Sequence, residues 1–208
     1  FWTRIQAARG HRPAEMCFVG DLFDIVRSPS WFDGPERPYD DPSPSLASKV
    51  DAIVFGILAR EAAFFEAIRR RVLSSELTVH YVLGNHDRLL RHAPNARRAV
   101  WKALTGEDRE IDFPEEKHFP HHRVLAYHGH RSDAVNYHPE GAGTIGDAIG
   151  SELIMPPPAI ESHAATIACF LAASASMSAF FRQSAFAGSA AIGSAAIGSD
   201  DIVSVAIG

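Results

Sequence analysis

The sequence predicts an α/β fold in which parallel strands are joined by helices. Short apolar runs at 16–19, 78–83 and 123–127 each end just before a glycine or a histidine. Between the first two runs, apolar residues recur at spacings of three, four and seven from Leu46 to Val72, as in an amphipathic helix. A strand, a helix and a strand in this order predict a βαβ unit with a right-handed connection.

The first elements follow from short patterns. Residues 1–8 place apolar side chains on one helical face, and Gly10 follows, so they predict the end of a helix. Met16 to Val19 is a continuous apolar run, typical of a parallel strand that is buried on both faces. Residues 27–45 contain five prolines and predict a long irregular loop, of the kind that often serves as a lid or a specificity element.

The later elements alternate between helix and strand. The amphipathic pattern from Ser45 ends in three consecutive arginines, which suit the negative end of a helix dipole better than a phosphate site. Thr78 to Leu83 is the second expected strand. A helix is predicted from Pro94, which suits a first helical position, to Leu104, and a third strand is predicted at 123–127.

Charge divides the chain into two parts. Only five of the 45 charged residues lie beyond position 150, so we expect one domain at 1–150 and an Ala/Ser/Gly-rich segment at 151–208. Residues 164–181 carry no charge, which makes a membrane span worth considering, but their many alanines favour a buried or loosely packed helix. From Ser184 a serine recurs every five residues, which predicts low complexity in preference to a short solenoid.

Composition limits which partners and which cellular compartment we expect. A net charge of −5 gives no basic footprint for nucleic acid, and we expect no membrane contact. Two distant cysteines, Cys17 and Cys169, favour a reducing compartment, and we expect the cytoplasm. The chain starts without a methionine or a signal peptide, so we expect its natural start to lie upstream. The sequence does not indicate an oligomeric state.

Polar side chains follow each of the three predicted strands. They are Asp21 and Asp24, then Asn85, His86 and Asp87, then His128 and His130. Taken singly, each group has an ordinary explanation, because Asp24 also suits a helix cap and Gly-Asn-His-Asp also suits a turn. The carboxyl ends of parallel strands share one edge, so these side chains are expected to converge. Carboxylate, amide and imidazole groups suit Mn²⁺, Fe or Zn²⁺.

Histidines are concentrated near the third predicted strand. Six of the eleven lie between positions 118 and 138, a cluster that indicates metal binding, pH sensing or no function at all. A carboxylate that bridges two metals can hold a water for attack on phosphorus, and a histidine that binds no metal can protonate the leaving group.

Three motifs in this order resemble signature blocks of the calcineurin-like metallophosphoesterases. They are Gly20-Asp21-Leu22-Phe23-Asp24, Gly84-Asn85-His86-Asp87 and His128-Gly129-His130. The resemblance covers roughly residues 15–138 and implies a layered sheet with flanking helices. It also implies hydrolysis of a phosphomonoester, phosphodiester or pyrophosphate by a metal-bound hydroxide, with a small phosphate ester as the substrate.

The resemblance also implies roles for single residues. Asp21 would bridge two divalent ions, preferably Mn²⁺, with Fe or Zn²⁺ as alternatives. Asn85 and His128 would bind the second ion, and His86 would be the catalytic imidazole, supported by Asp87. Asp24 would orient its neighbours.

The chain departs from the family pattern at both ends. An Asp-x-His block is not found before Asp21, and a Gly-His-x-His block is not found after His138. His130 and His138 are the alternative ligands, although histidines that are solvated or hydrogen-bonded locally are the simpler interpretation. Ile25-Val26 and Asp87 disfavour a serine/threonine protein phosphatase, and the small bacterial phosphoesterases and the UDP-diacylglucosamine pyrophosphatase type are nearer. The rival hypothesis is an incomplete, non-catalytic domain that acts as a binding or structural module.

Overall fold

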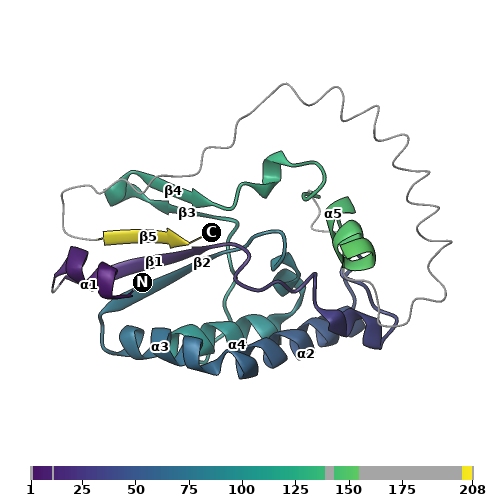
Figure 1. Cartoon of the computed structure of the whole chain (residues 1–208), viewed down its shortest axis with the longest axis horizontal. Coiled ribbons are helices and arrows are strands. Elements are labelled where there is room, and N and C mark those ends of the chain that lie inside the picture. The colour runs from purple at the N-terminus through teal and green to yellow at the C-terminus, as the bar shows by residue number, and fades with distance from the viewer. Residues whose placement is uncertain (1, 11, 139–142, 155–202, 208) are drawn as a thin grey trace.

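The chain forms three layers in the computed structural model, which describes residues 2–10, 12–138, 143–154 and 203–207 (Figure 1). A parallel sheet lies in the middle, with helices on one face and a two-stranded antiparallel sheet on the other. The helices are α1 (Trp2–Arg9), α2 (Pro44–Arg60), α3 (Ala62–Leu73), α4 (Pro94–Thr105) and α5 (Ile145–Ile149). The strands are β1 (Ala14–Val19), β2 (Leu77–Val82), β3 (Glu116–Phe119), β4 (Val124–Tyr127) and β5 (Val203–Ile207).

The central sheet has the strand order β2-β1-β5, and both pairs are parallel. Ala14 of β1 lies opposite Leu77 of β2, so the predicted parallel pairing of the first two strands is confirmed. The third strand, β5, comes from the repetitive end of the chain, where the five-residue repeat does not predict a strand. The uncharged stretch 164–181 lies outside the described residues.

Side chains of β1 alternate between two cores, as the pleat of a strand requires. Ala14, Met16 and Phe18 are buried against the helices, whereas Cys17 and Val19 face β3 and β4. The prediction that this strand is buried on both faces is therefore confirmed. The second core is small and also contains Val82, Phe119 and Ala126.

The helix predicted from Ser45 to Val72 is two helices. α2 begins at its expected place, because Pro44 occupies the first turn and the Ser43 side chain accepts a hydrogen bond from the Leu46 amide. It ends at Arg60, and α3 begins at Ala62 after the single intervening residue Glu61. The apolar spacing continues across this break, and neither glycine nor proline marks it. α4 agrees with its prediction to within one residue.

The third predicted strand does not belong to the parallel sheet. β4 pairs antiparallel with β3, Glu116 opposite Tyr127, and this pair packs over β1 and β2 through the second core. The expectation that all three strands end at one edge of a single sheet is therefore wrong. His128 reaches that edge from the layer above it instead.

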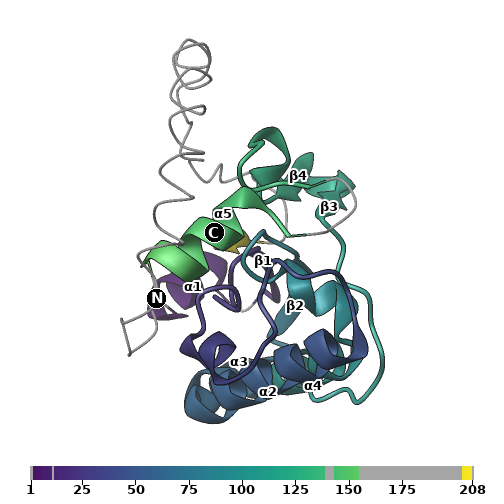
Figure 2. The same ribbon diagram turned by 90° about the vertical axis from the view of Figure 1, so that its right-hand side faces the viewer.

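The long proline-rich loop contains one short 3₁₀ helix, η1 (Pro29–Asp33). Trp31 anchors it, because this side chain is fully buried and its Nε1 donates a hydrogen bond to the carbonyl oxygen of Ile25 at 2.8 Å. α5 lies at the side of the molecule toward which the carboxyl ends of the parallel strands point (Figures 1 and 2). No helix in the described ranges is long and apolar enough to cross a membrane.

Candidate active site

Two glycines bring the ends of β1 and β2 into close contact. A Cβ atom on Gly20 would lie 2.7 Å from the Gly84 Cα and 2.4 Å from Cδ2 of His128. A Cβ atom on Gly84 would lie 2.2 Å from Oδ1 of Asp21. Only glycine fits at either position, and Gly20 also has a φ of +76°, which glycine adopts without strain. The absence of both Cβ atoms allows Asp21 and His128 to meet.

Asp21 links three segments of the chain. Its Oδ1 accepts a hydrogen bond from the His86 amide at 3.0 Å, and its Oδ2 lies 3.2 Å from Nε2 of His128. Its backbone has a φ of +53°, a left-handed conformation that costs a non-glycine residue about 1–2 kcal/mol. Strain of this kind is concentrated at functional sites. The predicted convergence of Asp21 and His128 is therefore present.

Burial and polar contacts act in opposite directions on the pKa values of Asp21 and His128. Burial by itself would raise the pKa of Asp21, but hydrogen bonds from His128 and the His86 amide outweigh burial, so the pKa lies below its ordinary value. The hydrogen bond to Asp21 raises the pKa of His128, against the effect of burial. Both pKa shifts favour the ionised carboxylate of Asp21 and the protonated ring of His128.

His86 forms a dyad with Asp24. Nδ1 of His86 lies 2.8 Å from Oδ1 of Asp24, and this hydrogen bond, ahead of the opposing effect of burial, raises the pKa of His86. The His86 side chain is 18% exposed and Asp24 is 48% exposed. A partly accessible imidazole held by a carboxylate is suited to donate a proton to a leaving group.

Asp87 does not support the His86 ring, contrary to the expectation from the family pattern. Its fully buried carboxylate accepts hydrogen bonds from the Tyr81 hydroxyl and from the Gly84 amide. Burial raises the pKa of Asp87 to about 6, despite these hydrogen bonds. Asp87 therefore fixes the turn that carries Asn85 and His86, and the partner of the ring is Asp24.

The remaining polar side chains of the candidate site are Asn85 and the histidines that follow β4. Asn85 is only 6% exposed, and its side chain makes no hydrogen bond to any residue that the structure describes. The rings of His128 and His130 lie 5.4 Å apart. Nδ1 of each is buried without a hydrogen-bond partner in the described part of the chain. His138 is exposed.

The spacing of one pair of donors, Asp21 and His128, is compatible with a divalent cation. Two ligands that each lie about 2.1 Å from a cation stand about 3.0 Å apart in an octahedral site and about 3.4 Å apart in a tetrahedral one. The 3.2 Å between Oδ2 of Asp21 and Nε2 of His128 lies between these values. Among the described residues, however, no three His, Cys, Asp or Glu side chains form a metal-binding group. Asn85 would have to be the third ligand, and the expected pair of ions stays a prediction.

Sequence reasoning missed Tyr81, which the strand pattern presents as an ordinary core residue, and Arg88, which directly follows the Gly-Asn-His-Asp motif. Comparison with known proteins adds no further assignment, because no family model, no curated protein and no solved structure matches the chain. The resemblance to the metallophosphoesterases therefore depends on the motifs and on the placement of their residues.

Proposed function

We propose that this chain carries the site of a metal-dependent phosphoesterase, which hydrolyses a small phosphate ester or pyrophosphate. One observation supports this most: strained Asp21 contacts both the His86 amide and the His128 ring, so three distant segments present polar groups at one point. Carboxylate, imidazole and amide oxygen are suitable ligands for Mn²⁺, Fe or Zn²⁺. The low cysteine content favours the cytoplasm as the compartment.

Each residue of the candidate site would have a separate role in this reaction. Asp21, His128 and Asn85 would hold the cation, which when bound activates water and neutralises charge on the phosphoryl oxygens. His86 would donate its Nε2 proton to the leaving oxygen, because Nδ1 is engaged by Asp24. The hydrogen bond with Asp24 raises the pKa of His86, which favours the protonated ring. Asp87 would hold the turn in place.

Replacing His86 tests this division of roles. We expect His86→Asn to lower kcat for p-nitrophenyl phosphate in the presence of Mn²⁺ by about a hundred- to ten-thousand-fold, the usual contribution of a general acid. Mn²⁺ affinity should change little, because the ring contacts Asp24 and is not a proposed ligand. Steady-state kinetics and Mn²⁺ titration measure the two quantities separately.

Exposed His121 provides the matched control. His121→Asn should leave both kcat and Mn²⁺ affinity unchanged. If His86→Asn retains the kcat of the unmodified chain, His86 is not the general acid. If the unmodified chain loaded with Mn²⁺ turns over neither a monoester, a diester nor a pyrophosphate, the phosphoesterase proposal is wrong.

The alternative is a non-catalytic metal-binding or structural module. It is favoured by the absence of a third His, Cys, Asp or Glu ligand within the described ranges. Such a module would bind at most one ion and would hydrolyse none of the three ester classes. Two bound ions per chain, together with turnover, would exclude it.

A further inference from the structure

Arg88 is a buried cation beside the site turn whose donors are largely unused. It is the first residue of the 3₁₀ helix η2 (Arg88–His92), two positions after His86, and its side chain is 8% exposed. Its Nη2 donates to the carbonyl oxygen of Pro38 at 3.0 Å and to Asp147. Its Nε and Nη1 are buried and make no hydrogen bond to the described residues. Unpaired donors on a buried charge are costly, and a bound water or an anionic ligand would satisfy them.

Arg97 shows how the same fold satisfies a buried guanidinium. It is equally buried, but its Nε donates to the Ile111 carbonyl oxygen at 3.0 Å and its Nη1 to the Leu90 carbonyl oxygen at 2.8 Å. Its Nη2 lies 3.3 Å from a carboxylate oxygen of Asp112. All three nitrogens of Arg97 therefore have partners, whereas two of those of Arg88 do not.

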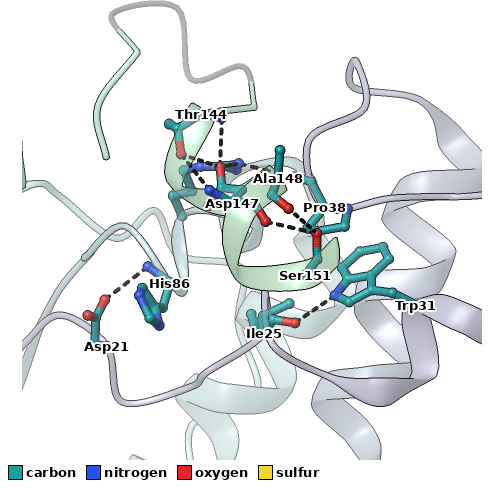
Figure 3. A network of polar contacts seen from close by, with 10 residues as sticks. Asp21, Ile25, Trp31, Pro38, His86, Thr144, Asp147, Ala148 and Ser151 are labelled. Atoms are coloured by element: carbon teal, nitrogen blue, oxygen red, sulfur yellow. Dashed lines mark hydrogen bonds and ion pairs between the residues drawn. The ribbon is translucent and has the colours of Figure 1, made fainter. Parts of the chain in front are cut away.

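The carboxylate that neutralises Arg88 belongs to a separate segment, Gly143–Glu152. Oδ2 of Asp147 accepts hydrogen bonds from the Thr144 amide at 2.7 Å and the Thr144 hydroxyl at 2.6 Å (Figure 3). It also accepts one from Arg88. A single oxygen thus serves three donors. The same segment makes a second ion pair, because Glu152 lies 3.1 Å from Nε of Arg37.

We propose that Arg88 binds an oxyanion of the ligand and that Asp147 takes the place of this oxyanion when no ligand is bound. Nη2, which holds Asp147, and the unused Nε lie on one edge of the guanidinium, so a phosphate that displaces Asp147 has the charge and the acceptor oxygens to bind both donors. That this oxyanion belongs to the substrate rests on the proposed function. If the oxyanion belongs to the substrate, the substrate is a phosphate ester with a second anionic group, such as a pyrophosphate ester.

The first experiment needs no catalysis. The full chain is freed of metal on a chelating resin, and its thermal unfolding is followed with increasing inorganic phosphate at constant ionic strength. Phosphate at ten times its Kd should raise Tm by about 4 °C through binding to the folded state. Asp147→Asn removes the competing carboxylate, so this variant should bind phosphate at least tenfold more tightly than the unmodified chain.

Two controls separate binding from general stabilisation by phosphate. The double variant Arg88→Gln with Asp147→Asn removes both charges and should show only the small salt effect. Arg97→Lys weakens a satisfied buried arginine and should keep the phosphate response of the unmodified chain. Equal responses in the unmodified chain, Asp147→Asn and the double variant would overturn the proposal and leave Arg88 a structural residue.

The second experiment tests the substrate class. With Mn²⁺, the double variant should raise KM for a pyrophosphate ester at least tenfold more than KM for p-nitrophenyl phosphate. Equal changes in the two KM values would contradict the assignment to substrate. Phosphate binding at Arg88 in a chain without turnover would reject the proposed function alone, whereas turnover without phosphate binding would reject this inference alone.

Discussion

Asp87 is the residue at which the local chemistry and the stability of the fold are most directly connected. Its carboxyl group is fully buried and holds both the Tyr81 hydroxyl and the Gly84 amide. Burial nevertheless raises its pKa to about 6 from the ordinary value of 3.8. Because the folded chain binds this proton more tightly than the unfolded chain, the stabilising effect of protonation is present below about pH 4 and is lost as the pH rises through 6.

Asp87→Asn should abolish this pH dependence. The amide has the same shape and can still accept from Gly84 and contact Tyr81. Between pH 4 and pH 8 the unmodified chain should lose about 3 kcal/mol of unfolding free energy relative to the variant, from a shift of roughly two pKa units. Urea unfolding of both metal-free proteins across this range measures the difference. Parallel profiles for the two proteins would show that Asp87 is not the titrating group.

At the scale of single residues, the sequence predicted which residues belong to the candidate site better than it predicted their contacts. Asp21 and His128 do meet, and Asp24 does orient a neighbour. The sequence could not assign the partner of His86, because Asp24 and Asp87 are both carboxylates near it. The choice between them depends on the path of the turn after β2, which buries Asp87 beneath the Gly84 amide. No local pattern encodes that path.

At the scale of elements, the close approach of the ends of β1 and β2 depends on glycine. Gly20→Ala would introduce a Cβ within 2.7 Å of the Gly84 Cα, at a backbone φ of +76°. We expect a loss of about 2–4 kcal/mol, from the left-handed conformation and from overpacking. Mn²⁺ affinity should fall as well, because the His128 ring has to move.

Gly56 in the middle of α2 is the matched control. A Cβ on Gly56 meets no atom within 4 Å, and the residue is exposed. Gly56→Ala should therefore stabilise the chain by about 0.5–1 kcal/mol through helix propensity. Chemical denaturation measures both variants. A Gly20→Ala protein as stable as the unmodified chain would contradict the close approach of β1 and β2.

The elements that sequence reasoning found are those with strong local signals. α4 has a proline at its start and a regular apolar face, and β1 and β2 are continuous apolar runs. β3 was not predicted, because three of its four residues, Glu116, Lys117 and His118, are polar. Its strand conformation depends on pairing with β4. The break at Glu61 was missed because neither a glycine nor a proline marks it.

At the scale of the whole molecule, the layers explain how distant segments reach one site. The helical layer supports β1 and β2 from one face, and the β3–β4 pair covers the other face through Cys17, Val82, Phe119 and Ala126. His128 therefore approaches Asp21 from a different layer than the His86 amide does. The sequence predicted the α/β class, but the arrangement of layers depends on long-range pairing that no local pattern specifies.

Mn²⁺ titration of the full chain, by calorimetry, tests the central claim most directly. The account predicts at least one tightly bound ion per chain, and a loss of more than about tenfold in affinity in each of Asp21→Asn, Asn85→Ala and His128→Asn. Asp41→Asn, at an exposed position, should bind as the unmodified chain does. Mn²⁺ binding that is absent from the unmodified chain, or that survives unchanged in Asp21→Asn, would contradict the account.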